Sequence, residues 1–214
     1  MITDPWFYVA AVPAVLLFGI AKGGFGGGLG VLAVPLMALV VSPLQAAAVL
    51  LPILCVMDLV GLWAYRGKWL WPELRILIPA SMVGIVVGTL LFGFMSAATV
   101  RIIVGIVAIA FTAHYLFSTR HSPDATLPFF PPAVGVAAGA AGGFTSFIAH
   151  AGGPPISIYL LRRPLDRTDF VATTVLLFAA INYVKLLPYG WLGQLSAANL
   201  LTSLVLAPLA PVGV

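Results

Sequence analysis

The residues best suited to chemistry lie in two glycine-rich stretches of an otherwise apolar chain. A glycine run breaks a helix, frees backbone N–H groups and lets an oxyanion approach the backbone closely. The positive end of the helix that follows favours a bound anion. The candidate substrate-binding residues are therefore Lys22, Gly23, Gly24, Gly26, Gly27 and Gly28 in the first stretch, and Gly142, Gly143, Thr145, Ser146, His150 and Gly153 in the second. The alternative is that these glycines only allow helices to pack closely.

Polar side chains near the two stretches could complete such a site. Lys22 could neutralise the anion, or its ammonium could extend to the membrane interface. Thr145 and Ser146 offer hydroxyl donors, and His150 offers either a ring N–H or a packing surface. Asn182 is a further candidate for the pocket. Lys185, one turn beyond, could accompany it, but we expect this lysine to reach the interface beside Pro188 and Tyr189.

Asp58 is the candidate coupling residue, because it is the only carboxylate well inside a predicted membrane span. A carboxylate buried without a partner could carry a proton. The alternative is a structural role as the partner of Lys22 or of a backbone amide.

Other chemistry is disfavoured. The three histidines lack metal-ligand spacing, no nucleophile–base pair can be assigned, and there is no P-loop. Gly28-x-Gly30-x-x-Ala33 imitates a dinucleotide fingerprint, but no soluble strand precedes it and no acid follows about twenty residues later. We predict that the chain is not an enzyme and holds neither a metal nor a cofactor.

The composition is that of a membrane protein. Apolar residues make up 62% of the 214 positions and charged residues 7%, and the mean hydropathy is +1.13. Soluble domains are typically about 45–50% apolar and about 25% charged. Ten basic residues, giving a net charge of +4, are too few for a surface that follows nucleic acid. No basic segment precedes the first apolar stretch, so a removable signal peptide is not expected.

The apolar segments predict an all-α, polytopic membrane protein with about seven membrane helical elements. A span needs about 20 residues. Ordinary spans are predicted at 46–65, 74–95, 99–118 and 170–187, with another from about 197 to the chain end. Residues 6–41 and 127–161 are each too long for one span and short for two, and their glycines and prolines predict broken or re-entrant helices.

The two broken elements resemble each other, which predicts an internal repeat. Gly23-Gly24-Phe25 matches Gly142-Gly143-Phe144, and a proline follows ten residues after each phenylalanine. The first repeat is assigned to residues 1–118, a linker to 119–128 and the second repeat to 129–214. The second repeat ends level with the middle of a first-repeat span, so we expect its C-terminal part to be incomplete; a naturally shorter chain is the alternative.

Charge predicts that the two repeats are inverted relative to each other. The loop at 66–75 is basic, and its counterpart at 188–196 is uncharged. The loop at 162–167 is basic, and its counterpart at 42–45 is uncharged. Because basic loops favour the cytoplasm, matching loops should lie on opposite sides of the membrane. Arg101 alone falls on the external side in this arrangement.

The spaced pair of motifs resembles the sulfite exporter TauE/SafE family, also called the toluene-sulfonate uptake permeases. The resemblance rests on the run from Lys22 to Leu29 followed by Val34-Pro35, on Gly142-Gly143-Phe144 with Gly152-Gly153-Pro154-Pro155, and on Gly84-x-x-x-Gly88. It implies a bacterial or archaeal inner-membrane, multi-pass permease for sulfur-containing or small organic anions.

The leading hypothesis is thus a secondary transporter for an anion such as sulfite or a sulfonate, bound at paired helix breaks near the membrane midplane. The alternatives are a channel-like pore for a small anion and a non-transporting membrane subunit. The expected partners are the anion and the lipid bilayer, without nucleic acid, and a homo-oligomer is left open.

Overall fold

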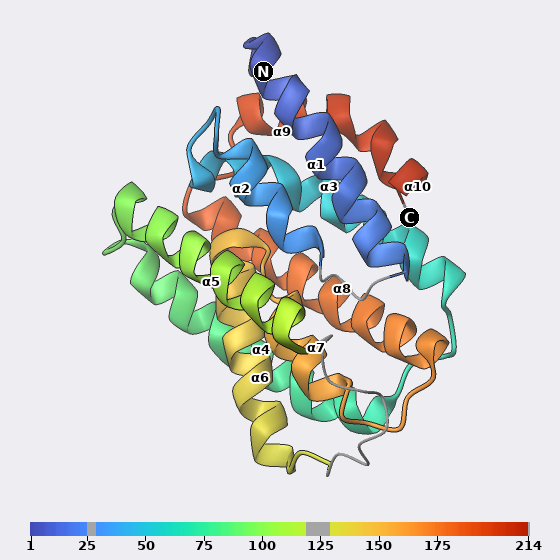
Figure 1. Ribbon diagram of the computed structural model, residues 1–214. Coiled ribbons are helices and arrows are strands. Elements are labelled where there is room, and N and C mark those ends of the chain that lie inside the picture. Colours follow the sequence, from blue (N-terminus) through green and yellow to red (C-terminus); the bar gives the residue numbers. More distant parts are fainter. Residues whose placement is uncertain (25–28, 119–128, 214) are drawn as a thin grey trace.

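The computed structural model describes residues 1–24, 29–118 and 129–213, and these form helices and connecting turns with no strand among them (Figure 1). The elements are α1 Pro5–Gly24, η1 Leu29–Leu32, α2 Ala33–Met37, α3 Pro43–Ala64, α4 Trp71–Phe92, α5 Ala97–Ser118, α6 Pro132–Ala149, α7 Gly153–Leu160, α8 Arg167–Trp191, α9 Ala197–Leu206, η2 Ala207–Leu209 and α10 Ala210–Gly213.

Local sequence signals explain where several helices begin. Ser42, Asp166 and Ser196 precede α3, α8 and α9, and each side chain accepts a hydrogen bond from the backbone N–H three residues later. Such caps satisfy an N–H that has no partner inside the helix. Pro43 and Pro72 stand in the first turns of α3 and α4, where a missing N–H costs little.

Five helices are long and apolar enough to cross a membrane, namely α1, α3, α4, α6 and α8. The predicted spans at 46–65, 74–95 and 170–187 correspond to α3, α4 and α8, and α5 covers the span predicted at 99–118. The predicted span from 197 is interrupted, because α9 ends at Leu206 and a 3₁₀ turn containing Pro208 separates it from α10.

Both stretches predicted to be broken do contain separate helices. In the first, α1 ends at Gly24, and η1 and α2 follow after Leu29. In the second, α6 and α7 are separated at 150–152. The helix continues through Gly139, Gly142 and Gly143, so the expectation that these glycines also interrupt it is wrong. The break instead lies where the glycine and proline pairs begin.

The glycines inside α6 serve close packing against α4. A Cβ built on Gly143 would lie 2.1 Å from the carbonyl oxygen of Ser81, and one on Gly84 would lie 2.0 Å from that of Ala140. Both distances are far below contact, so only glycine allows the two backbones to approach this closely. Figure 1 shows α4 and α6 side by side at the lower end of the molecule.

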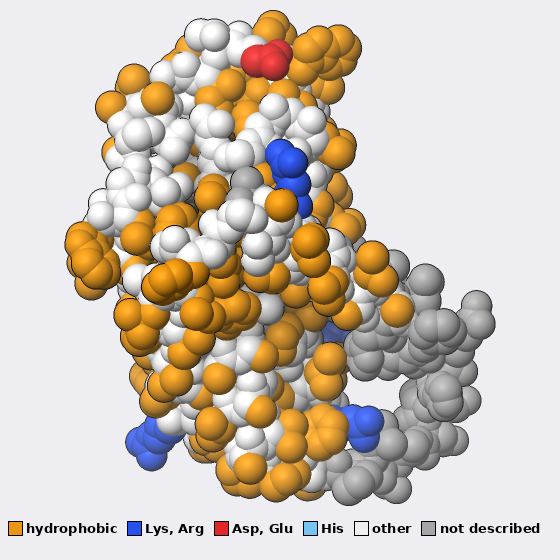
Figure 2. All heavy atoms as spheres, turned by 90° about the vertical axis from the view of Figure 1, so that its left-hand side faces the viewer, with side chains coloured by type: hydrophobic (Ala, Val, Ile, Leu, Met, Phe, Trp, Pro, Cys, Tyr) orange, Lys and Arg blue, Asp and Glu red, His pale blue; other side chains and the backbone are white. Residues whose placement is uncertain are grey.

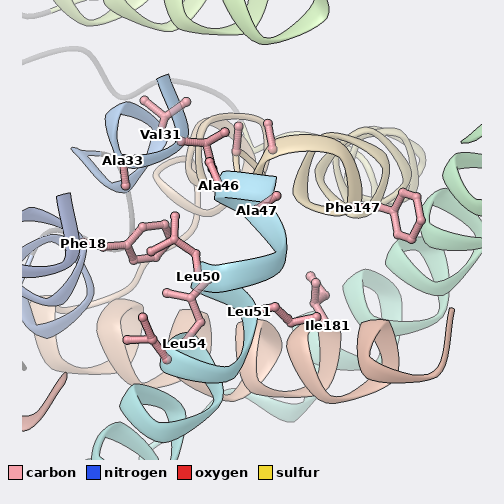
Figure 3. Close-up of a cluster of buried hydrophobic side chains, with 14 of the residues drawn as sticks. Phe18, Val31, Ala33, Ala46, Ala47, Leu50, Leu51, Leu54, Phe147 and Ile181 are labelled. Atoms are coloured by element: carbon pink, nitrogen blue, oxygen red, sulfur yellow. The ribbon is translucent and has the colours of Figure 1, made fainter. Parts of the chain in front are cut away.

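The core and the outer surface are both apolar. In Figure 3, Leu50, Leu51 and Leu54 of α3 lie among side chains of α1 and α8, including Phe18 and Ile181. On the face shown in Figure 2, hydrophobic side chains and backbone cover most of the described surface, and few charged groups appear. Exposed apolar surface on this scale suits contact with lipid.

Candidate functional site

A small cavity lies where α1, α3, α8 and the break between α6 and α7 meet. Its lining residues are Phe18, Lys22, Leu54, Ser146, His150, Gly153, Thr174, Val175, Phe178 and Asn182. The cavity measures about 20 Å³, which is room for about one water molecule. In this conformation the pocket is therefore too small for a sulfonate-sized anion.

One side of the cavity is formed by a buried ion pair between α1 and α3. The Lys22 ammonium pairs with the Asp58 carboxylate, and the Asn182 amide donates to the other Asp58 oxygen at 2.8 Å. Asp58 is completely buried, and Lys22 is 4% exposed. The pair shows that Lys22 does not extend to an interface here. Its charge is already balanced by the carboxylate.

The opposite side is formed by a second polar group, which links α8 to the second break. The Lys185 ammonium donates to the Ser146 carbonyl oxygen and hydroxyl, each at 3.0 Å, and to His150 Nδ1 at 2.7 Å. His150 Nε2 lies 2.8 Å from the Ala47 carbonyl oxygen. A carbonyl only accepts, so Nε2 carries the proton and Nδ1 is free to accept from the lysine.

Lys185 differs from the sequence-based expectation. The sequence predicts it at the membrane interface beside Pro188 and Tyr189, and this prediction is wrong because its side chain is completely buried. Three acceptors within reach hold it inside, and Tyr189 is itself buried, with its hydroxyl donating to the Phe147 carbonyl oxygen. The spacing of Asn182 and Lys185 on one helix face was the signal that pointed to the interior.

The second break has a defined geometry. His150 adopts the left-handed conformation with φ of 52°, the only described non-glycine residue with positive φ. Its N–H donates to the Ser146 carbonyl oxygen at 3.0 Å, which closes the end of α6. The eight-residue helix α7 then begins at Gly153. Pro154 and Pro155 have no N–H, so Gly152 and Gly153 supply the free backbone donors at this helix end.

The structure brings together part of the predicted site. Lys22, Ser146, His150, Gly153 and Asn182 line the cavity, and Asp58 is bonded to two of them. Thr145 is absent from the lining; its hydroxyl lies 2.8 Å from the Ala141 carbonyl oxygen and 3.0 Å from that of Ala151. The backbone N–H groups of Thr145 and Ser146 lie within α6, where hydrogen bonds along the helix occupy them.

The glycines predicted to bind the substrate have different surroundings in the structure. The Gly23 carbonyl oxygen accepts from the Tyr65 hydroxyl at 2.8 Å, and Gly24 is the last residue of α1. A Cβ on Gly142 would lie 2.7 Å from the Ile156 side chain, and Gly143 packs on Ser81 as described above. Neither lines the cavity. Gly26, Gly27 and Gly28 lie outside the described residues.

The side chains at the cavity are hydrogen-bonding and charged groups among apolar residues. In the described ranges, no three His, Cys, Asp or Glu side chains gather in a way that could hold a metal ion. Cys55, the one cysteine of the sequence, is buried in α3. What the cavity offers is the Lys22 ammonium, the Ser146 hydroxyl and the Asn182 amide in apolar surroundings, with the Lys185 ammonium behind Ser146 and His150, and such donors suit a small anion.

Comparison with known proteins identifies the family of the chain. The family model described as sulfite exporter TauE/SafE matches residues 11–214. No curated protein and no solved structure matches the chain. The match includes both helix breaks and every residue that lines the cavity. The chain therefore belongs to the sulfite exporter TauE/SafE family, a family of membrane transporters rather than enzymes.

Proposed function

We propose that this protein is a secondary transporter of the inner membrane that moves small sulfur-containing or organic anions, such as sulfite or sulfonates. The observation that carries the proposal is the small, mostly apolar cavity between α1, α8 and the second helix break, where Lys22, Ser146 and Asn182 present polar groups. Membership of a transporter family supports the class of function, and the donors around the cavity support an anion as the substrate.

In this proposal the anion binds at the N-terminal end of α7. The Gly152 and Gly153 N–H groups, the Ser146 hydroxyl and the Asn182 amide are the donors available there. The positive end of the α7 dipole adds a favourable interaction of up to about 2 kcal/mol in a partly buried geometry. Because the cavity has room for only about one water, α1 and α8 must move apart before the anion can enter.

Lys22 and Asp58 could couple binding to proton movement. While the two are paired, the Lys22 charge is not available to an anion. Protonation of Asp58 would remove its charge and free the ammonium at the cavity wall. We therefore propose Asp58 as the coupling residue.

The two broken elements are proposed to be the matching halves of an inverted repeat, with about seven membrane helical elements in the chain. The first half contributes Lys22 to the cavity, and the second contributes Ser146, His150 and Gly153. Gly26, Gly27 and Gly28 are proposed to complete the site from the first break. A two-fold arrangement of this kind would put the anion near the membrane midplane.

A channel-like pore is the second candidate. An open pore needs a continuous water-filled path, whereas the cavity between the described elements measures only about 20 Å³. This small volume favours the transporter.

The proposal is tested by uptake of radiolabelled sulfite and of methanesulfonate into proteoliposomes. Ser146→Val fills space at the cavity and removes a donor, so we expect uptake to fall about tenfold or more. Ser203→Val is the matched control, because Ser203 is an equally buried helical serine whose hydroxyl lies 2.7 Å from the Val49 carbonyl oxygen, away from the cavity. Lack of uptake of any small anion by the wild type would overturn the proposal, as would equal effects of the two variants.

A further inference from the structure

The buried charges around the cavity do not balance. Among the described residues, two lysines and one carboxylate are buried in the bundle, namely Lys22, Lys185 and Asp58. Lys22 and Asp58 pair with each other and cancel. Lys185 has no carboxylate within ion-pair distance in the described part of the chain. This leaves one uncompensated positive charge behind the cavity wall.

The contacts of Lys185 suit an ammonium. Its three N–H donors match three groups that can accept at 2.7–3.0 Å from Nζ, namely the Ser146 carbonyl oxygen and hydroxyl and His150 Nδ1. None of the three acceptors carries a negative charge, because two belong to Ser146 and the third is the unprotonated ring nitrogen of His150.

Two of the groups that contact Lys185 also line the cavity. Ser146 and His150 stand between Nζ and the pocket, whereas Lys185 itself is not part of the lining. A full charge one side chain behind a small, mostly apolar pocket acts strongly on any ion there, since little solvent lies between to screen it. A buried charge is costly until an opposite charge balances it.

We propose that Lys185 sets the charge preference of the site: it is a positioning residue whose uncompensated charge makes the cavity select monovalent anions. This inference rests on the proposed transport of anions. One bound monoanion neutralises the three buried charges together, whereas a dianion leaves one negative charge in excess and a neutral molecule leaves the positive charge unbalanced. The lysine contributes its charge and does not contact the anion itself, because Ser146 and His150 separate its ammonium from the cavity.

A purely structural role is the competing explanation. Lys185 donates to the Ser146 carbonyl oxygen in the last turn of α6, and a cation at a helix C-terminus stabilises that helix. Such a role would change stability and binding of every ligand alike. It would not change the preference between ligands of the same shape and different charge. The test must therefore measure that preference.

The test is calorimetric binding of three similar tetrahedral molecules to the purified full chain: methanesulfonate with one negative charge, sulfate with two and neutral dimethyl sulfone. The wild type should bind methanesulfonate about tenfold or more tightly than either of the others. Lys185→Met keeps the length of the side chain and removes the charge. It should weaken methanesulfonate binding by roughly thirtyfold or more relative to dimethyl sulfone, and Lys185→Arg should restore part of the preference.

The matched control is Lys68→Met, which removes the charge of an exposed lysine that does not line the cavity and leaves the three buried charges in place. It should keep the preference for methanesulfonate over sulfate. Equal binding of sulfate and methanesulfonate by the wild type overturns the inference without any variant, and so does an unchanged preference in Lys185→Met. The proposed transport function would survive either result, because it is tested by uptake into proteoliposomes and by the comparison of Ser146→Val with Ser203→Val.

Discussion

At the scale of single residues, the cavity is organised by two lysines in different electrostatic situations. Lys22 is neutralised by Asp58, and Asn182 completes the hydrogen bonding of that carboxylate. Removing one member of a buried pair leaves the other charge uncompensated, which typically costs about 3–5 kcal/mol. Removing both members costs much less. Measurements of unfolding and of anion uptake can therefore separate the contribution of the pair to stability from its contribution to coupling.

We predict that Asp58→Asn abolishes the dependence of anion uptake on an imposed pH gradient and lowers the free energy of unfolding by about 3–5 kcal/mol. The stability loss arises because Lys22 is left buried without its partner. In the double variant Lys22→Met/Asp58→Asn most of the stability should return, but the gradient dependence should stay lost. Uptake in proteoliposomes and thermal unfolding in detergent check the two parts. Gradient-driven uptake by Asp58→Asn equal to that of the wild type would remove Asp58 from the coupling step.

The sequence predicts those residues of the candidate site whose polar or charged side chains are rare in apolar segments. Lys22, Asp58 and His150 stand out as polar residues in apolar segments, and all three lie at or beside the cavity. For Lys185 the sequence favours the membrane interface over the cavity, because a lysine near the end of a span commonly reaches the interface. Only the folded chain shows that Ser146 and His150 form acceptors for it inside the bundle.

At the scale of helices, the α4–α6 contact shows what the glycines of the second repeat contribute to the fold. Gly143 lies against the Ser81 backbone, and the Ser81 hydroxyl donates to the Gly139 carbonyl oxygen at 3.1 Å. Two helices whose backbones touch leave no room for a methyl group. The close approach positions the C-terminal end of α6, and with it Ser146 and His150, relative to the rest of the bundle.

We predict that Gly143→Ala lowers the free energy of unfolding by about 3 kcal/mol or more, since the new Cβ would lie 2.1 Å from the Ser81 carbonyl oxygen and would force α4 and α6 apart. Gly190→Ala is the matched control. Gly190 is also helical, and no atom lies within 4 Å of a Cβ built on it, so this change should be neutral or slightly stabilising. Thermal unfolding in detergent measures both. A fully stable Gly143→Ala variant that has lost anion binding would instead support the direct substrate contact expected from the sequence.

The sequence predicts most of the long helices, but it does not predict where the helix break within residues 127–161 lies. Length, apolar composition and proline placement located α3, α4 and α8 to within a few residues. Glycine content alone does not separate a helix break from a helix contact, because both need a residue without a side chain. In α6, Gly139 and Gly143 lie against the neighbouring helix α4, and α6 continues through them without a break. At 150–152 the turn forms before Pro154 and Pro155, whose rings do not fit inside a helix.

At the scale of the whole molecule, the two basic loops lie at one end of the bundle. Arg163 forms an ion pair with Glu73 at 3.2 Å, and the Tyr159 hydroxyl donates to the same carboxylate at 2.8 Å. The Leu70 N–H donates to Thr173 Oγ1 at 3.1 Å, which ties the loop before α4 to the start of α8. The loops come from different halves of the chain, so their shared location agrees with the charge argument. Their assignment to the cytoplasmic side stays a prediction.

We predict that the loops at 66–75 and 162–167 face the cytoplasm and that the loop at 188–196 faces outward, because basic residues are retained on the cytoplasmic side during insertion. The single cysteine, Cys55, is buried and can be replaced by alanine as a background. In that background, Lys68→Cys and Arg167→Cys should resist a membrane-impermeant maleimide applied to intact cells and react after permeabilisation, whereas Gln194→Cys should react in intact cells. Strong external labelling at Lys68→Cys or Arg167→Cys would contradict the orientation. Labelling of one but not the other would also contradict the shared side that the Arg163–Glu73 ion pair requires.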